Sequence, residues 1–526
     1  MRKKTATRAT PRPATRPPAR RATQSAAPPP ARPATQPATP PPAPANFPLA
    51  ALGRSRWVYV LVSLLLLAPC YWQPHIEAGD LASHIYNSWL AQLIERHQAP
   101  GLKIVGQSTN ILFDLMLSGL FKLLGPDAAQ RISVSLAVLI FLWGAFAFAG
   151  AVSGRRPWQI MPSIAMLAYG WVYHMGFFNF YLSLGLCFWA LALVWNPSPR
   201  RLAAAVPVLA LAYPAHALPV VWAVALAVYI FLASRISARW RACVIAGSLL
   251  AMVIVHVAVG SLMGARWSSQ QIEMTTGLDQ VWVFDAKYKA VLIGLLIVWA
   301  GMFLNLMRRG GVRQVLSGTA FQISALTAAG IFILPSTVQI PGFNHALVYI
   351  AERMSLGVGI CLCAMLACAR PRPFERYAMV AVAVVFFGFL YRDERALNSF
   401  EDRMHDAVAS LPPGERVISA MVDDPALRVN ALAHVIDRAC VGHCYSYANY
   451  EPSTAQFRIR ATAENPIVAY TYEDSWLMQV GAYVVKDRDL PLYQVDVDAG
   501  GRMAIKTLRA GVPCGSTTWK LLPDLL

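Results

Sequence analysis

The chain has 526 residues, of which 56% are hydrophobic and 14% charged, and its mean hydropathy is +0.43. This composition excludes an ordinary soluble enzyme and is typical of a polytopic membrane protein. The net charge of +18 does not indicate nucleic-acid binding, because the basic residues gather in the N-terminal segment and in short breaks between apolar runs, as in cytoplasmic loops.

Residues 1–55 are rich in Pro, Ala, Thr and Arg and contain no acidic residue. The segment has too few large apolar side chains to offset the entropy cost of ordering it, so it predicts a disordered cytoplasmic tail. We expect no cleavable signal peptide. The first apolar run, which begins near Trp57, is expected to stay in the membrane as an anchor.

Apolar stretches of spanning length, separated by charged breaks, predict about eleven transmembrane helices within residues 56–391. The predicted spans are residues 57–73, 132–152, 159–174, 177–195, 202–215, 217–234, 242–262, 288–307, 317–334, 350–369 and 376–391. With a cytoplasmic N-terminus, the Arg-rich breaks fall inside and the acidic loop 74–131 falls outside. The stretch 108–125 in that loop predicts an interfacial amphipathic helix, because a crossing there would invert every later loop.

Residues 392–526 differ in composition from the apolar part. Runs such as "ERVISAMV" and "LYQVDVD" alternate apolar and polar residues and predict strands, whereas "LRVNALAHVIDRAC" has helical spacing. The predicted fold is therefore an all-α polytopic membrane protein followed by a small C-terminal α/β domain on the extracytoplasmic side.

Three cysteines, Cys440, Cys444 and Cys514, lie in this C-terminal part. An oxidising periplasm favours a disulfide among them, but the sequence does not fix which two are joined. The alternative is a zinc site that uses Cys440 and Cys444 together with His434 and His443.

The first two acidic residues of the chain, Glu77 and Asp80, directly follow the first predicted span. Asp80 opens "DLASHIYNSWLAQLI", whose apolar spacing predicts an amphipathic helix at the outer surface. Because it follows Gly79, Asp80 also suits the N-cap of that helix. A carboxylate at the boundary between water and lipid is in addition well placed to take a proton from a hydroxyl group, and the two roles can coexist.

This order of elements resembles the GT-C superfamily of integral-membrane glycosyltransferases, which includes protein O-mannosyltransferases and aminoarabinose transferases. The resemblance covers most of residues 57–391, and three segments, "WVYHMGFFNFYLSLGLCFWALAL", "LALAYPAHALP" and "YIAERMSLGVGICL", resemble those of bacterial members. It implies transfer of a sugar from a polyprenyl-phosphate donor to a hydroxyl of a glycan, lipid or protein. The reaction would take place at the periplasmic face of a bacterial inner membrane and invert the anomeric carbon.

The resemblance also implies roles for individual residues. Asp80 would take the proton of the acceptor hydroxyl; Glu77 is a second acid in the same loop, and which of the two is the base stays open. The departing phosphate needs fixed cations, for which Arg353 in "ERM" is the preferred candidate. The alternative for Arg353 is an interfacial anchor paired with Glu352.

Three further residues are candidates for substrate binding. His84 lies one helical turn after Asp80 and would orient its carboxylate, His216 in "YPAHALP" would contact acceptor or phosphate, and Lys103 is a further outer cation. No metal is predicted, because the histidine spacings match no zinc signature.

The rival functions are a transporter or flippase of lipid-linked sugars and a non-catalytic membrane scaffold. Transport through a bilayer usually places paired ionisable groups in the middle of the spans. The predicted spans nearly lack acidic residues, which favours the enzyme.

Overall fold

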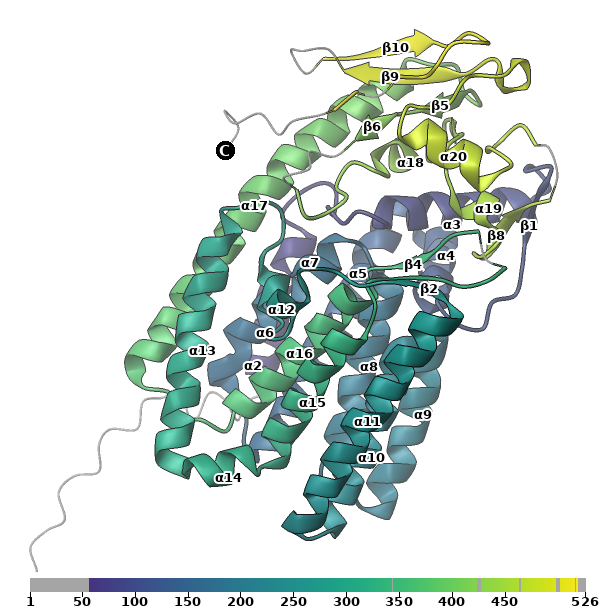
Figure 1. Ribbon diagram of the computed structural model, residues 1–526. Helices are drawn as coiled ribbons and strands as arrows, with labels where there is room; N and C mark the ends of the chain where they lie inside the picture. Colours follow the sequence, from purple (N-terminus) through teal and green to yellow (C-terminus); the bar gives the residue numbers. More distant parts are fainter. Residues whose placement is uncertain are drawn as a thin grey trace, which may run out of the picture. The chain divides into compact units, whose positions relative to one another are not determined.

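The computed structural model describes residues 56–342, 344–422, 427–462, 465–497, 502–515 and 517–518. The chain divides into two compact units, Met1–Val58 and Tyr59–Leu526. The segment 1–55 lies outside the described residues, so its disorder stays a prediction. The chain is mostly helical, with several small sheets (Figure 1).

Five helices of the described part are long and apolar enough to cross a membrane. They are α5 (Pro126–Ser153), α10 (Ala217–Arg235), α11 (Ala238–Leu262), α13 (Tyr288–Gly310) and α17 (Pro373–Ala409). Shorter helices in the remaining predicted spans are α2 (Arg56–Leu66), α6 (Met161–Ala168), α7 (Trp171–His174), α8 (Phe178–Val194), α9 (Pro199–Ala215), α15 (Thr319–Ile333) and α16 (Ile350–Leu366). A multi-pass membrane protein is therefore supported, whereas eleven crossings stay a prediction.

Helices α5 and α8 pack closely because glycines face each other at their contact. A Cβ atom on Gly144 would lie 2.4 Å from the carbonyl oxygen of Gly185, and one on Gly185 would lie 2.6 Å from the Cα of Phe141. Small residues of this kind let helix backbones approach in a membrane, where there is no hydrophobic force between helices. Gly144 on α5 and Gly185 on α8 therefore allow the two helices to pack at close distance.

The C-terminal part contains a four-stranded sheet in the order β10–β9–β5–β7. Its strands are β5 (Arg416–Ile418), β7 (Tyr445–Ser446), β9 (Tyr493–Val497) and β10 (Met503–Thr507). Strand β5 is parallel to β7 and β9, and β9 is antiparallel to β10. Three short helices accompany the sheet: α18 (Val435–Ala439), α19 (Glu451–Thr454) and α20 (Tyr472–Gln479). The strands expected at "ERVISAMV" and "LYQVDVD" correspond to β5 and β9.

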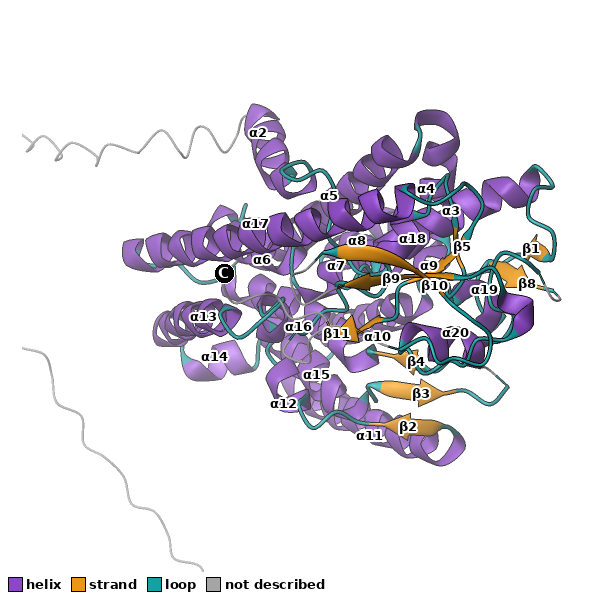
Figure 2. Cartoon of the chain, turned by 90° about the horizontal axis from the view of Figure 1, so that it is seen from above, coloured by secondary structure: helices purple, strands orange, loops and turns teal. Residues whose placement is uncertain are grey.

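The C-terminal part is continuous with the helical part. Helix α17 runs without interruption through residue 391, so the expected boundary at 391/392 falls inside a helix. Strand β8 (Ile459–Ala461) pairs antiparallel with β1 (Leu102–Ile104), which belongs to the expected outer loop 74–131. Seen from above, the strands and the short helices α18–α20 lie over the ends of the long helices (Figure 2).

The expected outer loop also contains helices α3 (Leu81–Glu95) and α4 (Leu112–Leu124). Helix α4 occupies the stretch 108–125 that the sequence marked as an amphipathic helix. Cys440 and Cys444 are joined by a disulfide, so these two sulfurs are not the thiolate ligands that the zinc alternative requires. Cys514 is a buried free thiol.

The Arg-rich breaks gather at one end of the helical part. Arg155 donates to the carbonyl oxygen of Ala367 at 2.9 Å, and the Asn305 amide donates to that of Arg370 at 2.8 Å. Helix α14 (Val312–Leu316), which contains Arg313, lies at the opposite end of Figure 1 from strands β9 and β10. This separation agrees with the alternation expected from the charges.

Candidate functional site

Asp80 occupies the N-cap position of α3, yet its side chain makes no capping hydrogen bond. The backbone around it is held in place, because Gly79 donates to the His174 carbonyl oxygen at 2.8 Å and Asp80 donates to that of Met175 at 3.1 Å. A Cβ atom on Gly79 would lie 2.8 Å from the Asn430 carbonyl oxygen, so only glycine fits there. The backbone of Asp80 is thus held in place, and its side chain is 27% exposed and is not used for capping.

The nearest ionisable partner of Asp80 comes from the C-terminal part. The Nε2 atom of His434 lies 3.8 Å from a carboxylate oxygen of Asp80, and its Nδ1 atom lies 2.8 Å from one of Asp437 on α18. Burial lowers the pKa of His434, but the hydrogen bond to Asp437 and the charges of Asp437 and Asp80 outweigh it and raise the pKa. The three side chains form a carboxylate–imidazole–carboxylate series that ends at the partly exposed Asp80.

Aromatic rings border this series. The ring of Tyr450 lies 5.6 Å from the rings of both His434 and His345, and it stacks on His345. Burial and the charge of Asp80 hold the pKa of Tyr450 well above its usual value, so its hydroxyl stays a neutral donor. Tyr450 lies directly before α19, and His345 lies two residues before β4 (Leu347–Val348), so the site lies where these segments meet the start of α3.

Arg353 supplies a cation in the first turn of α16. Its guanidinium carbon lies 3.6 Å from the centre of the Phe177 ring, and the charge of Asp80 acts on it. The Nε atom of Arg353 is buried and has no hydrogen-bond partner among the described residues. An ion pair with Glu352 is likewise absent from the part of the chain that the structure describes. The charge of Asp80 therefore reaches Arg353, which links two of the residues that the sequence singled out.

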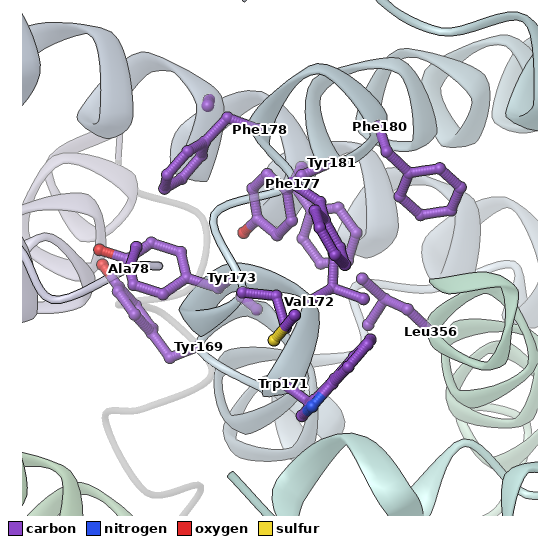
Figure 3. Close-up of a cluster of buried hydrophobic side chains, with 14 of the residues drawn as sticks. Ala78, Tyr169, Trp171, Val172, Tyr173, Phe177, Phe178, Phe180, Tyr181 and Leu356 are labelled. Carbon is purple, nitrogen blue, oxygen red and sulfur yellow. The ribbon is translucent and has the colours of Figure 1, made fainter. Parts of the chain in front are cut away.

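The Phe177 ring beneath Arg353 is part of a buried aromatic cluster (Figure 3). It lies 5.8 Å from the ring of Trp171 and 6.0 Å from that of Tyr349. Because Phe177 is only 8% exposed, its ring gives the guanidinium a fixed cation–π contact.

Glu77 lies in a different environment from Asp80. It is 7% exposed and accepts a hydrogen bond from the Asn398 amide of α17 at 2.7 Å. Burial and the charge of Glu401 raise the pKa of Glu77 well above its usual value, although Arg438 opposes them. Glu77 thus fastens the loop to α17.

His84 bonds to a partner that the sequence did not indicate. Its Nδ1 atom lies 2.7 Å from a carboxylate oxygen of Asp114 on α4, and the Asn179 amide donates to the other oxygen at 2.7 Å. Burial alone would lower the pKa of His84, but the charge and hydrogen bond of Asp114 raise it to about 9. Burial also opposes ionisation of Asp114, yet His84 and Asn179 keep its pKa low. His84 therefore holds α3 against α4, and its imidazole does not bond to Asp80.

The other two predicted binding residues, His216 and Lys103, have different local environments. His216 is the N-cap of α10, where its Nδ1 atom accepts from the backbone N–H of Leu218 at 3.2 Å. Its ring meets that of Phe180 edge to face, with the ring centres 5.5 Å apart. Lys103 is exposed on strand β1 opposite Arg460. His216 is therefore a helix cap on which the charge of Arg353 acts, whereas Lys103 lies on an exposed strand.

Comparison with protein-family models, with curated proteins and with solved structures gives no match. The arrangement of the site therefore rests on its own geometry. Over the described residues, no group of three or more His, Cys, Asp or Glu side chains is placed to hold a metal ion. What Asp80, His434 and Arg353 offer chemically is a proton acceptor beside a cation.

Sequence reasoning missed Asp437 and Tyr450, and it considered His345 and His434 only as possible metal ligands. The spacing of His434 and Asp437 in "HVID" puts both on one helical face, which was a usable local signal for the pair. No local pattern connects that pair to Asp80, because the contact depends on how the C-terminal part packs on α3.

Proposed function

We propose that the protein is a membrane glycosyltransferase that moves a sugar from a polyprenyl-phosphate donor to an acceptor hydroxyl. The observation that carries the proposal is the free carboxylate of Asp80, which makes no helix-capping bond and lies beside His434 and within the field of Arg353. A partly exposed base beside a fixed cation is the pairing that inverting transfer from a phosphate ester requires. The resemblance to the GT-C superfamily supplies the substrate class.

In this proposal Asp80 accepts the proton of the acceptor hydroxyl. The acceptor oxygen forms a bond to the anomeric carbon while the bond from that carbon to the phosphate oxygen breaks, which inverts the carbon. The leaving phosphate carries the electron pair away, and the guanidinium of Arg353 stabilises the charge that develops on it. Stacking on Phe177 at 3.6 Å keeps the guanidinium oriented during this step.

His434 and Asp437 assist the base by position. The 2.8 Å hydrogen bond to Asp437 fixes the imidazole so that Nε2 faces Asp80. Asp80 is a better base than Glu77 in this arrangement, because Glu77 is buried and already bonded to Asn398.

The same proposal places the molecule in a membrane. Asp80 and the C-terminal part would face the periplasm of a bacterial inner membrane, and the Arg-rich breaks and the N-terminus would face the cytoplasm. About eleven crossings would connect them. The acceptor would be a glycan, lipid or protein that reaches the outer face.

The test compares Asp80→Asn with Asp127→Asn in membrane vesicles supplied with a polyprenyl-phosphate sugar and a hydroxyl acceptor. Asp127 is an exposed acid in the first turn of α5 and serves as the matched control. We expect Asp80→Asn to lower the transfer rate by about 100-fold or more at unchanged membrane abundance, and Asp127→Asn to leave it unaltered. Unimpaired transfer by Asp80→Asn would refute the role of Asp80. Donor translocation without any transfer would instead identify a flippase.

A further inference from the structure

A large apolar groove runs along the surface of α2, α5 and α8 and shares no residue with the Asp80 site. Its volume is about 930 Å³. Its lining residues are Tyr59, Leu136, Leu139, Ile140, Trp143, Phe146, Ala147, Gly150, Gly154, Arg155, Arg156, Pro157 and Trp189. The lining contains two cations and no acid, so the groove combines a long apolar wall with a positively charged end.

The length of the groove follows from the helix that forms its floor. Leu136 and Gly150 lie on α5, and a rise of 1.5 Å per residue separates them by about 21 Å. Half the hydrocarbon core of a bilayer is about 15 Å thick. The groove therefore accommodates one hydrocarbon chain that extends from the level of the headgroups towards the middle of the bilayer.

Aromatic rings make the walls of the groove stiff. Tyr59 lies 5.2 Å from Trp143, and Trp143 lies 5.4 Å from Phe146. The indole N–H of Trp143 donates to Ser63 at 3.0 Å, and that of Trp189 donates to the Ile140 carbonyl oxygen at 3.1 Å. Because both N–H groups are satisfied within the protein, the ring faces are left as apolar contact surface.

The charged end of the groove is formed by Arg155 and Arg156, which follow the C-cap residue Gly154 of α5 and are both exposed. Arg155 is held by the carbonyl oxygens of Ala367 and Ala369, and the guanidinium of Arg156 lies 5.6 Å from the centre of the Tyr59 ring. Two further basic residues, Arg370 and Arg376, are close enough to act on Arg155. Burial and their positive charges lower the pKa of Arg155. An anion bound here would relieve repulsion among these cations.

We propose that this groove binds an anionic phospholipid, with the phosphate at Arg155 and Arg156 and one acyl chain along α5. A guanidinium binds phosphate oxygens through two hydrogen bonds, and basic residues at a membrane surface select anionic lipids. The proposal does not depend on the reaction at Asp80, which involves other residues.

The test uses the full-length protein in nanodiscs that contain equal amounts of phosphatidylglycerol and phosphatidylcholine, and it measures the lipid that stays bound by native mass spectrometry. We expect the wild type to retain phosphatidylglycerol about tenfold over phosphatidylcholine. Two variants attack the groove independently: the double variant Arg155→Gln with Arg156→Gln removes the charges, and Ala147→Trp fills the apolar part without altering charge. Both are expected to lose the preference by about tenfold.

The matched control is the double variant Arg200→Gln with Arg201→Gln. These two arginines are exposed at the start of α9, in another Arg-rich break, and do not line the groove. They are expected to leave retention unchanged. Equal loss in the control, or equal retention of the two lipids by the wild type, would overturn the proposal. Displacement of phosphatidylglycerol by added polyprenyl phosphate from the wild type would assign the groove to the prenyl chain and also overturn it.

Discussion

Replacement of His84 by glutamine tests whether the ion pair with Asp114 fastens α3, and with it Asp80, to α4. The pair is largely buried, with side-chain exposures of 13% and 17%. A rise of the His84 pKa from 6.5 to about 9 corresponds to roughly 3 kcal/mol of stabilisation. In mutational studies, removing one partner of a buried ion pair lowers the free energy of unfolding by about 3–5 kcal/mol. The value from the pKa shift agrees with the lower end of this range.

The pH dependence has a definite sign. Because the pKa of folded His84 lies above the unfolded value, its contribution is complete below pH 6.5 and is lost as the pH rises towards about 9. Asp114 has a lowered pKa, so its contribution is lost only in acid. The stability advantage of the wild type over His84→Gln should therefore be about 3 kcal/mol near pH 6 and should shrink by pH 9.

The assay is thermal unfolding of the purified protein in detergent from pH 6 to pH 10. The double variant His84→Gln with Asp114→Asn is the matched control, because it leaves no buried charge unpaired and should cost less than His84→Gln alone. A difference between wild type and His84→Gln that is the same at pH 6 and pH 10 would refute the ion-pair account.

Two further predictions concern the loop that carries Asp80. Glu77→Gln should leave the transfer rate unchanged and alter the free energy of unfolding by no more than about 1 kcal/mol. The reason is that burial already favours the neutral form of Glu77 and that an amide preserves its shape. A loss of transfer of about 100-fold, as expected for a removed base, would make Glu77 the base instead. Gly176→Ala should destabilise the protein by about 2 kcal/mol or more in thermal unfolding and lower transfer, because Gly176 has φ of +81° and a Cβ atom would lie 2.5 Å from the Asp80 nitrogen. Gly125→Ala, with φ of +80° and nothing within 4 Å of its Cβ position, is the control for the cost of φ alone, and an equal effect of the two substitutions would refute the steric explanation.

The apolar pattern predicted the helices well, because hydrophobic runs bounded by arginine are a local property of the sequence. The apolar pattern gave wrong helix bounds where contacts with residues far along the chain determine the backbone conformation. The expected span 159–174 is divided into α6 and α7 at Tyr169 and Gly170. A Cβ atom on Gly170 would lie 2.7 Å from the carbonyl oxygen of Gln280, which belongs to a short 3-10 helix (Leu278–Val281) far along the chain. The pattern likewise ended the last span at residue 391, whereas α17 continues through a polar second half to Ala409.

The sequence could predict which residues of the candidate site lie near one membrane surface, because that depends on where they stand relative to the apolar runs. Asp80 follows the first apolar run and Arg353 begins a later one, so both were expected near the same membrane surface. The partners of His84 and Asp80 were not predictable in this way. Spacing of four residues suggested that His84 serves Asp80, but Asp114 lies 2.7 Å from the His84 ring because α4 folds back along α3.

The position of Asp80 explains how one residue can begin a helix and still be available for chemistry. An N-cap carboxylate normally accepts a hydrogen bond from the first turn, which would occupy it. Here Asp80 has helical backbone angles, φ of −69° and ψ of −12°, and its carboxylate makes no such bond. The loop is held instead by backbone hydrogen bonds to His174 and Met175 and by Glu77 on Asn398. Because these contacts define where α3 begins, the Asp80 carboxylate is free to face His434.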